Sequence, residues 1–357
     1  MPFPGNQSAR NVAAPFARRS FRHSVSSVIV SGQFSWHDKR RNDSCLGCAY
    51  GLCNSARKKH VSTPTMIQIT LPDGSLREYD QPLSVHELAA SISSELASAA
   101  VAGRVNGVLV DCEYMIEADA RVSIVTPREP DGLEILRRSC ALMLAMAIKQ
   151  LHPHAQMHAG KELGDGFFYE FAVEQPLTPA DLPLIEARMQ SLAATNHSIR
   201  RRPPREEVPL YRLGDTEYPS LGPHVPTTKV LQAFTLDHIS GTLQQRIYGT
   251  CWSNHQELQH WRVPPHVVVV SMDDRQATYA QAVTESLRQR GVRARADLRS
   301  EKVHYKIRQH SRTVPYLVVV GEKEQAGGFV SVRSRTGEDF GRMAVEAACE
   351  WLSRPGI

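Results

Sequence analysis

The chain has 357 residues, of which 41% are hydrophobic and 22% are charged, a composition typical of a soluble protein with two or three domains. No apolar run approaches the roughly eighteen residues of a membrane-spanning helix, so we expect no membrane partner. The formal net charge of +5 comes from the first 65 residues, which hold ten Lys or Arg and two acids. The seven Cys show no regular spacing, which favours a reducing compartment.

Residues 1–65 form a basic leader that we predict to be disordered. No acid precedes Asp38, and the early arginines lie among Ser, Ala and Phe, which is typical of an organelle transit peptide. A non-targeting extension or a mis-set start fits equally well, because the first regular element begins at Met66. The predicted location is cytoplasmic, with an organelle as the alternative.

The leader also contains one CxxC pair, Cys45 and Cys48, and a third cysteine, Cys53. A zinc knuckle takes four ligands, usually from two such pairs, and the nearest His is His60. We therefore predict no metal site, and we predict no cofactor for the chain.

Residues 66–127 show the alternation of a small sheet. The segment MIQITLPDGSLREYD alternates apolar and polar residues around a Pro-Asp-Gly turn, which predicts a hairpin. Ser84 is expected to cap a helix from Val85 to Ile92, and the strands Gly107–Asp111 and Arg121–Val125 are expected to pair. This β-grasp pattern resembles the TGS domain of threonyl-tRNA synthetases, a small binding module without catalytic residues.

Residues 128–262 begin with a long predicted helix, for which Asp131 is the expected cap. Its apolar residues keep steps of three and four: Leu133, Leu136, Cys140, Leu144, Ala147 and Leu151. The helix and the segment after it, which ends in GKELGDGFFYEF, resemble the editing domain of the same synthetases. The resemblance implies an editing-type α+β domain.

In that family, two His on one helix face and a CxxxH pair remove serine from wrongly charged tRNA. The resemblance places these four positions at Arg138, Leu142, Ser220 and His224. Arg138 stays protonated at neutral pH, and Leu142 has no lone pair to direct water. We therefore expect the editing fold with a degenerate centre and no catalytic residues.

Two features of this region have competing interpretations. His152, His154 and His158 follow the long helix and are more typical of a surface loop than of a rebuilt active site. The run Arg200–Arg205 contains paired prolines, which predict a linker or a strip that contacts an RNA backbone.

The phrase LQQRIYGTCW, residues 243–252, resembles the end of the editing region. A short helix, Asn254 to Trp261, and the stretch Val263-Pro264-Pro265 then lead directly into the next domain. In threonyl-tRNA synthetases the class II catalytic domain lies between these two landmarks. The resemblance therefore implies a chain without the aminoacylation domain, and we lean against an enzyme.

Residues 263–357 open with the apolar run Val267 to Val270, which predicts a buried strand. A helix ending at Gly291, a strand from Val292 to Ala296, a helix to about Ser311 and a strand from Val314 to Val320 complete a parallel α/β unit. A closing helix, expected to start near Gly341, ends near Leu352.

Between Arg288 and Arg312 the chain has nine Lys or Arg and two acids, which predicts a polyanion partner, with a solvated helix face as the alternative. The stretch ADLRSEKVHYKIRQHSRTVPYLVVVGEKE resembles the anticodon-binding domain of threonyl-tRNA synthetase. The match extends from Val263 to about Trp351.

The resemblance implies that Lys302, Glu324 and Arg333 read anticodon bases. Arg offers a planar fork to a guanine edge, Glu accepts from a base amino group, and Lys serves a phosphate or a carbonyl. The alternatives are structural: Glu324 decorates a turn, and Arg333 pairs with Glu338 or Asp339. The other residues of the predicted tRNA-binding set are Arg299, Lys306 and Arg308.

The resemblance covers residues 66–357 and implies a multidomain α+β and α/β fold. The predicted function is that of a non-catalytic threonyl-tRNA synthetase-like protein that binds tRNA, with threonine tRNA as the first candidate, as an accessory or regulatory factor. Two alternatives stay open: a free-standing deacylase that clears misacylated tRNA, and a subunit that pairs with a full-length threonyl-tRNA synthetase.

Overall fold

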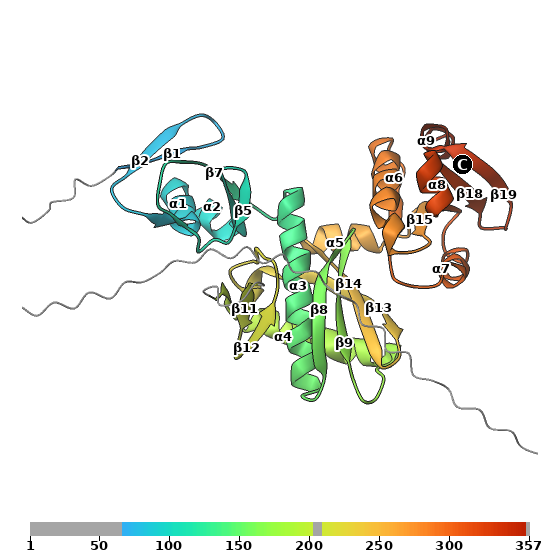
Figure 1. The fold of residues 1–357 in the computed structure, drawn as a ribbon, viewed down its shortest axis with the longest axis horizontal. Coiled ribbons are helices and arrows are strands. Elements are labelled where there is room, and N and C mark those ends of the chain that lie inside the picture. Colours follow the sequence, from blue (N-terminus) through green and yellow to red (C-terminus); the bar gives the residue numbers. More distant parts are fainter. Residues whose placement is uncertain (1–65, 203–208, 355–357) are drawn as a thin grey trace, which may run out of the picture. The chain divides into compact units, whose positions relative to one another are not determined.

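The computed structural model describes residues 66–202 and 209–354 (Figure 1). The predictions for the leader, including its cysteines and its transit-peptide character, lie outside these residues, as do Pro203, Pro204 and Arg205. Within the described ranges, no helix is both long enough and apolar enough to cross a bilayer.

The N-terminal domain is a five-stranded sheet with the strand order β2-β1-β7-β4-β5, flanked by two helices. Its main strands are β1 (Ile67–Thr70), β2 (Leu76–Tyr79), β4 (Ala102–Val105), β5 (Val108–Val110) and β7 (Ala120–Val125). The remaining elements are the short pair β3 (Leu83–Ser84) and β6 (Met115–Ile116), with α1 (Val85–Ile92) and α2 (Ser94–Ala99).

Two local predictions for this domain have different outcomes. Ser84 caps α1, as predicted, and the structure adds a reciprocal capping box with Glu87. The two strands expected to pair are instead separated by β4, which bonds to both β5 and β7. The sequence gives little sign of β4 because it contains Gly103, where a side chain would collide with Val85.

The central domain places α3 (Pro130–Leu151) and α4 (Leu182–Ala194) against a sheet of order β13-β14-β9-β8. Its strands are β8 (Gln156–Leu163), β9 (Gly166–Ala172), β13 (Ala233–Gly241) and β14 (Gln244–Trp252). A second sheet contains β10 (Ile199–Arg201), β11 (Leu210–Leu213) and β12 (Thr216–Pro219). The 3-10 turns η1 (Pro179–Asp181) and η2 (Thr228–Val230) complete it.

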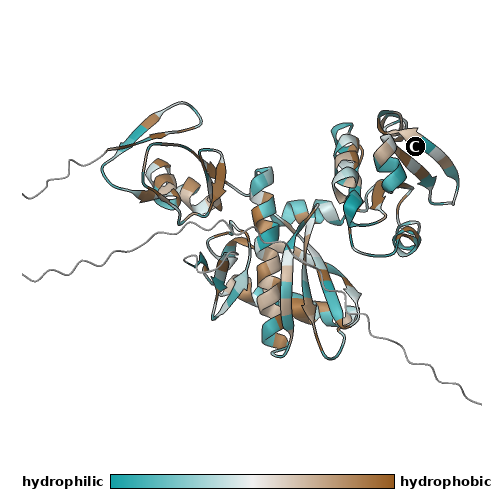
Figure 2. Cartoon of the chain, viewed as in Figure 1, coloured by the Kyte–Doolittle hydropathy of each residue, from teal (hydrophilic) through white to brown (hydrophobic). Residues whose placement is uncertain are grey.

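Helix α3 is more deeply buried than its predicted stripe implies, because every residue from Ser139 to Ile148 is buried. Figure 2 shows a mainly apolar middle section of this helix. Asp131 is not its cap: the N-cap is Glu129, with Pro130 in the first turn. Asp131 instead forms an ion pair with Arg104 of β4.

Helix α5 (His255–Arg262) leads into the C-terminal sheet, which has the order β16-β15-β17-β18-β19. The parallel strands are β15 (Val267–Ser271), β16 (Ala294–Asp297) and β17 (Tyr316–Val320), and β18 (Phe329–Ser334) and β19 (Asp339–Ala344) are antiparallel. The helices are α6 (Ala277–Gln289), α7 (Val303–His310), α8 (Glu322–Gly327) and α9 (Val345–Leu352), and η3 (Asp274–Gln276) precedes α6.

The parallel β/α unit was correctly predicted, but the start of the closing helix was not. Gly341 lies inside β19 at φ +76°, and α9 begins four residues later. Because glycine adopts this left-handed conformation without strain, here it serves an irregular strand rather than a helix start.

Candidate functional site

The first candidate site is a buried cluster around His224 in the central domain. The backbone N–H of His224 donates to Asp111 Oδ1 over 2.9 Å, and the Tyr211 hydroxyl donates to Asp111 Oδ2 over 2.7 Å. The edge of the Tyr211 ring meets the imidazole, with ring centroids 4.4 Å apart. Asp111 follows β5 of the N-terminal domain, so two predicted domains share this cluster.

Both ring nitrogens of His224 have serine partners. Nε2 lies 2.7 Å from Ser220 Oγ, and Nδ1 lies 3.1 Å from Ser139 Oγ. Ser139 donates its own proton to the Ile135 carbonyl and accepts from Val225 N–H, so it accepts from Nδ1–H. Ser220 therefore donates to Nε2. Burial, helped by the charge of Arg138, lowers the pKa of His224 to about 3, which keeps the ring neutral.

Arg138 ties the loop after β12 to the central sheet. Its guanidinium is bidentate to Glu162, at 2.7 and 3.1 Å, and its Nη1 donates to the Gly222 carbonyl over 2.7 Å. Leu142 lies in the apolar core and is 3% exposed. The structure thus brings Arg138, Ser220 and His224 into one cluster and leaves Leu142 outside it.

A cavity of about 190 Å³ borders His224 and is also lined by Asp111, Glu113 and Arg201. Asp111, Ser139 and Tyr211 were missed by the sequence analysis. They lie 13 to 113 residues from His224 in the sequence, and no motif links them to it, so only the fold reveals them. No group of three or more potential metal ligands occurs among the described residues.

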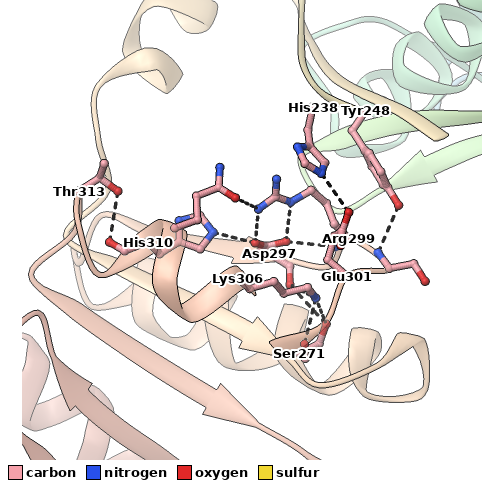
Figure 3. A network of polar contacts seen from close by, with 11 residues as sticks. His238, Tyr248, Ser271, Asp297, Arg299, Glu301, Lys306, His310 and Thr313 are labelled. Atoms are coloured by element: carbon pink, nitrogen blue, oxygen red, sulfur yellow. Dashed lines mark hydrogen bonds and ion pairs between the residues drawn. The ribbon is translucent and has the colours of Figure 1, made fainter. Parts of the chain in front are cut away.

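The second candidate site is the C-terminal domain around α7, where Asp297 is the centre of a polar network (Figure 3). Asp297 ends β16 and accepts from Arg299 Nε and Nη2, at 2.9 and 2.6 Å, and from His310 Nε2 at 2.7 Å. Burial alone would raise the pKa of this carboxyl, but the bonds from Arg299 and His310 hold it well below its usual range.

Lys306 belongs to the inner face of α7 and is completely buried. Its Nζ donates to the Ser271 carbonyl over 3.0 Å and to the Asp297 carbonyl over 3.2 Å, at the carboxyl ends of β15 and β16. This corrects the prediction that Lys306 contacts RNA, because its ammonium group has no access to a ligand. Arg299 is similarly engaged, bonding Asp297 and Gln309.

The remaining predicted residues are arranged differently. Lys302, at the N-cap of α7, and Arg308 are exposed. Arg333 of β18 is also exposed and lies 3.2 Å from Asp339, which is the structural alternative foreseen for it. Glu324 of α8 accepts from Gly321 N–H and from the Ser331 hydroxyl, both at 3.1 Å, so its carboxylate has a fixed position.

Residues of the central sheet also reach this region. His238 Nε2 lies 3.2 Å from Glu301 Oε1, and the Tyr248 hydroxyl accepts from Ser300 N–H over 3.2 Å. These contacts join the β13–β14 hairpin to the turn before α7 (Figure 3). Sequence analysis did not find His238 or Tyr248, because their partners lie more than 50 residues away.

Comparison with known families identifies the two outer domains. Residues 67–126 match the TGS domain, and residues 266–354 match the anticodon binding domain. The chain is therefore a multidomain protein that combines these two modules.

The relatives define the class further. A threonine--tRNA ligase from Polaromonas sp. (strain JS666 / ATCC BAA-500) is 42% identical over 231 residues, and one from Legionella pneumophila (strain Corby) is 41% identical. Each alignment covers 55% of this chain and 36% of the relative, so the chain matches about a third of each relative's length. Over the aligned residues, the chain is similar to these threonine--tRNA ligases.

The RNA binding domain of threonyl-tRNA synthetase from Cryptosporidium parvum Iowa II is a similar solved structure, at 14% identity. The match covers 63% of this chain and 60% of that one with a TM-score of 0.24, which is too low to establish a common fold.

Proposed function

We propose that the chain binds tRNA through its C-terminal domain and acts as an accessory or regulatory factor rather than as a ligase. The observation that carries this proposal is the contrast among the cations of α7 and its N-cap. Lys306 is buried against the Asp297 network, whereas Lys302, at the N-cap, and Arg308 are exposed. Neither of these two cations has a carboxylate partner among the described residues, so both are available to phosphates.

The neighbouring sheet offers groups that suit base edges. Arg333 presents a planar fork whose exposed pair with Asp339 costs little to break. Glu324 is held by Gly321 and Ser331, and a fixed carboxylate is a suitable acceptor for base amino groups. The relatives' printed name supports threonine tRNA as the first candidate ligand.

The join between the central and C-terminal domains supports a non-catalytic role. Between Trp252 at the end of β14 and Val267 at the start of β15, the chain forms α5 and two short connections. A class II catalytic domain cannot occupy this interval, which is where the family resemblance expects it.

The test is a binding titration of the full chain with threonine tRNA at 50 to 200 mM salt. We expect affinity to fall steeply with salt, because phosphate contacts release counterions. Arg333→Ala should weaken binding or relax anticodon choice by about 1–3 kcal/mol. Arg188→Ala, in α4 of the central domain, is the matched control and should bind normally. Binding that is insensitive to both salt and Arg333 would overturn the proposal.

A free-standing deacylase is the second candidate, and the Ser220–His224–Ser139 chain of hydrogen bonds favours it. This arrangement has the order of a nucleophile, a base and an orienting group. The lowered pKa of His224 argues against it, because so weak a base accepts a proton poorly.

Release of serine from seryl-tRNA distinguishes the two functions. Ser220→Ala removes the hydroxyl group without disturbing the Ser139 bond, and His224→Gln replaces the ring. Turnover by the wild type that both variants abolish would establish the deacylase and overturn the non-catalytic role. Absence of turnover in a chain that binds tRNA supports the accessory role.

A further inference from the structure

Helix α7 exposes an aromatic ring among its cations. Tyr305 is 39% exposed, and it lies three residues after Lys302 and three before Arg308, a spacing that places all three on neighbouring parts of one helix surface. Arg312, two residues beyond the end of α7, is exposed as well. None of these three cations forms an ion pair within the described ranges. A large ring between unpaired positive charges is an arrangement that suits an unpaired nucleobase and its phosphates.

The Tyr305 ring is supported from behind by the central sheet. Its centroid lies 6.0 Å from the His238 ring, which lies 5.9 Å from Tyr248, and Tyr248 lies 5.7 Å from Phe168. Tyr248 and Phe168 are buried, so Tyr305 is the exposed end of this aromatic row. Support of this kind fixes a ring before a ligand arrives and reduces the entropy lost on binding.

Hydrogen bonds fix the row at the turn before α7. His238 is bonded to Glu301, and the Tyr248 hydroxyl accepts from Ser300 N–H (Figure 3). Burial, with the nearby charge of Arg299, lowers the pKa of His238 despite Glu301, which favours the neutral ring beside Tyr305. The central domain thus contributes to the outer surface of α7.

We propose that Tyr305 is a stacking platform for an unpaired RNA base, that Lys302 and Arg308 hold the flanking phosphates, and that His238 is a positioning residue for the platform. This inference rests on the proposed tRNA-binding function. It adds a base-stacking residue outside the predicted set and assigns the central domain a part in the RNA-binding surface.

The experiment uses the full chain and an anticodon stem-loop RNA of threonine tRNA with 2-aminopurine placed at successive loop positions. We expect binding to quench the fluorescence at one position, because stacking on tyrosine quenches this base analogue. Tyr305→Ala should weaken binding about 5- to 150-fold and abolish the quench. Tyr305→Phe should bind within about twofold of the wild type, since it keeps the ring.

Three controls make the result specific. Tyr114→Ala removes an exposed tyrosine of the N-terminal domain and should leave binding unchanged. A blunt RNA duplex without a loop should bind Tyr305→Ala and the wild type equally. His238→Ala should reduce the quench with a smaller loss of affinity than Tyr305→Ala, because it frees the ring without removing it.

The outcomes distinguish failure of the stacking platform from failure of the proposed tRNA-binding function. If the wild type fails to bind tRNA, both proposals fall. If the wild type binds with a steep salt dependence, and Tyr305→Ala binds the stem-loop equally well with the quench intact, only the platform is overturned.

Discussion

The cluster around His224 and the network beneath α7 are made of the same chemical groups but differ in what they leave free. Each has an Arg–carboxylate pair, a bonded imidazole and backbone carbonyls that accept from a cation. In the first, two serines are hydrogen-bonded to the two ring nitrogens of His224, and the Arg138 guanidinium is bonded to Glu162 and to the Gly222 carbonyl. In the second, Asp297 and Lys306 bond to each other's segments in the interior, while Lys302 and Arg308 stay exposed. We therefore expect the second region, and not the first, to bind a ligand, because it leaves cations exposed.

The largest effect should come from Asp297→Ala, which removes the centre of the α7 network. Arg299 and Lys306 would lose a buried counter-charge and His310 would lose a hydrogen-bond partner, and breaking a buried pair of this kind costs about 3–5 kcal/mol. Hydrogen exchange of the β15 amides measures this loss as a lower free energy of opening. Asp339→Ala, which breaks an exposed pair, is the control and should cost at most about 1 kcal/mol.

The same network predicts an acid dependence with a definite sign. The pKa of Asp297 is lower in the folded state than its unfolded value of about 3.9. The contribution to stability is therefore complete above about pH 4 and is lost as the pH falls towards the folded pKa. Asp297→Ala should lack this loss below pH 4, and an unchanged acid profile in the variant would contradict the assignment.

Protonation of His224 should change the free energy of unfolding by a smaller amount and at a higher pH. Its pKa is about 3 in the folded state and about 6.5 in the unfolded state, so below pH 6.5 the unfolded chain binds a proton that the folded chain excludes. The wild type should lose about 2 kcal/mol of stability between pH 6.5 and 5 through this group. Hydrogen exchange of α3 amides at the two pH values measures it.

His224→Gln is the matched variant for this measurement, because glutamine keeps a polar side chain that does not titrate. Its stability should be lower at pH 7 but should change less between pH 6.5 and 5. If stability changes with pH in the same way in the two proteins, His224 is solvated and titrates normally. The description of His224 as a buried, neutral ring would then be wrong.

Features that depend on neighbours in the chain could be predicted from the sequence. They are the strand at Val267–Val270, the Ser84 cap and the dense positive charge of residues 288–312. The β4 strand could not be predicted, since it contains Gly103, and the close approach of Val85 that requires a glycine there is visible only in the fold.

The sequence pattern also could not predict whether a charged side chain points into the protein or towards solvent. Lys306 and Arg308 are both cations and lie two residues apart on α7, yet Lys306 is fully buried and Arg308 is exposed. The difference follows from the carboxyl ends of β15 and β16, whose carbonyls receive the Lys306 ammonium. Partners of this kind come from strands 9 to 35 residues away, and pattern analysis has no access to them.

The smallest change in stability, and the sharpest contrast between the clusters, is expected from a pair of arginine variants. Arg308→Gln alters an exposed side chain that forms no ion pair with residues 66–202 or 209–354, so its effect on stability should stay within about 0.5 kcal/mol. The salt dependence of tRNA binding should lose about one phosphate contact. Arg138→Gln should do the reverse, because it breaks the Glu162 and Gly222 bonds but leaves the α7 surface intact. Thermal unfolding and salt titration of both variants test this reciprocity. An Arg138→Gln protein that folds normally and loses a phosphate contact would place the RNA surface on the central domain instead.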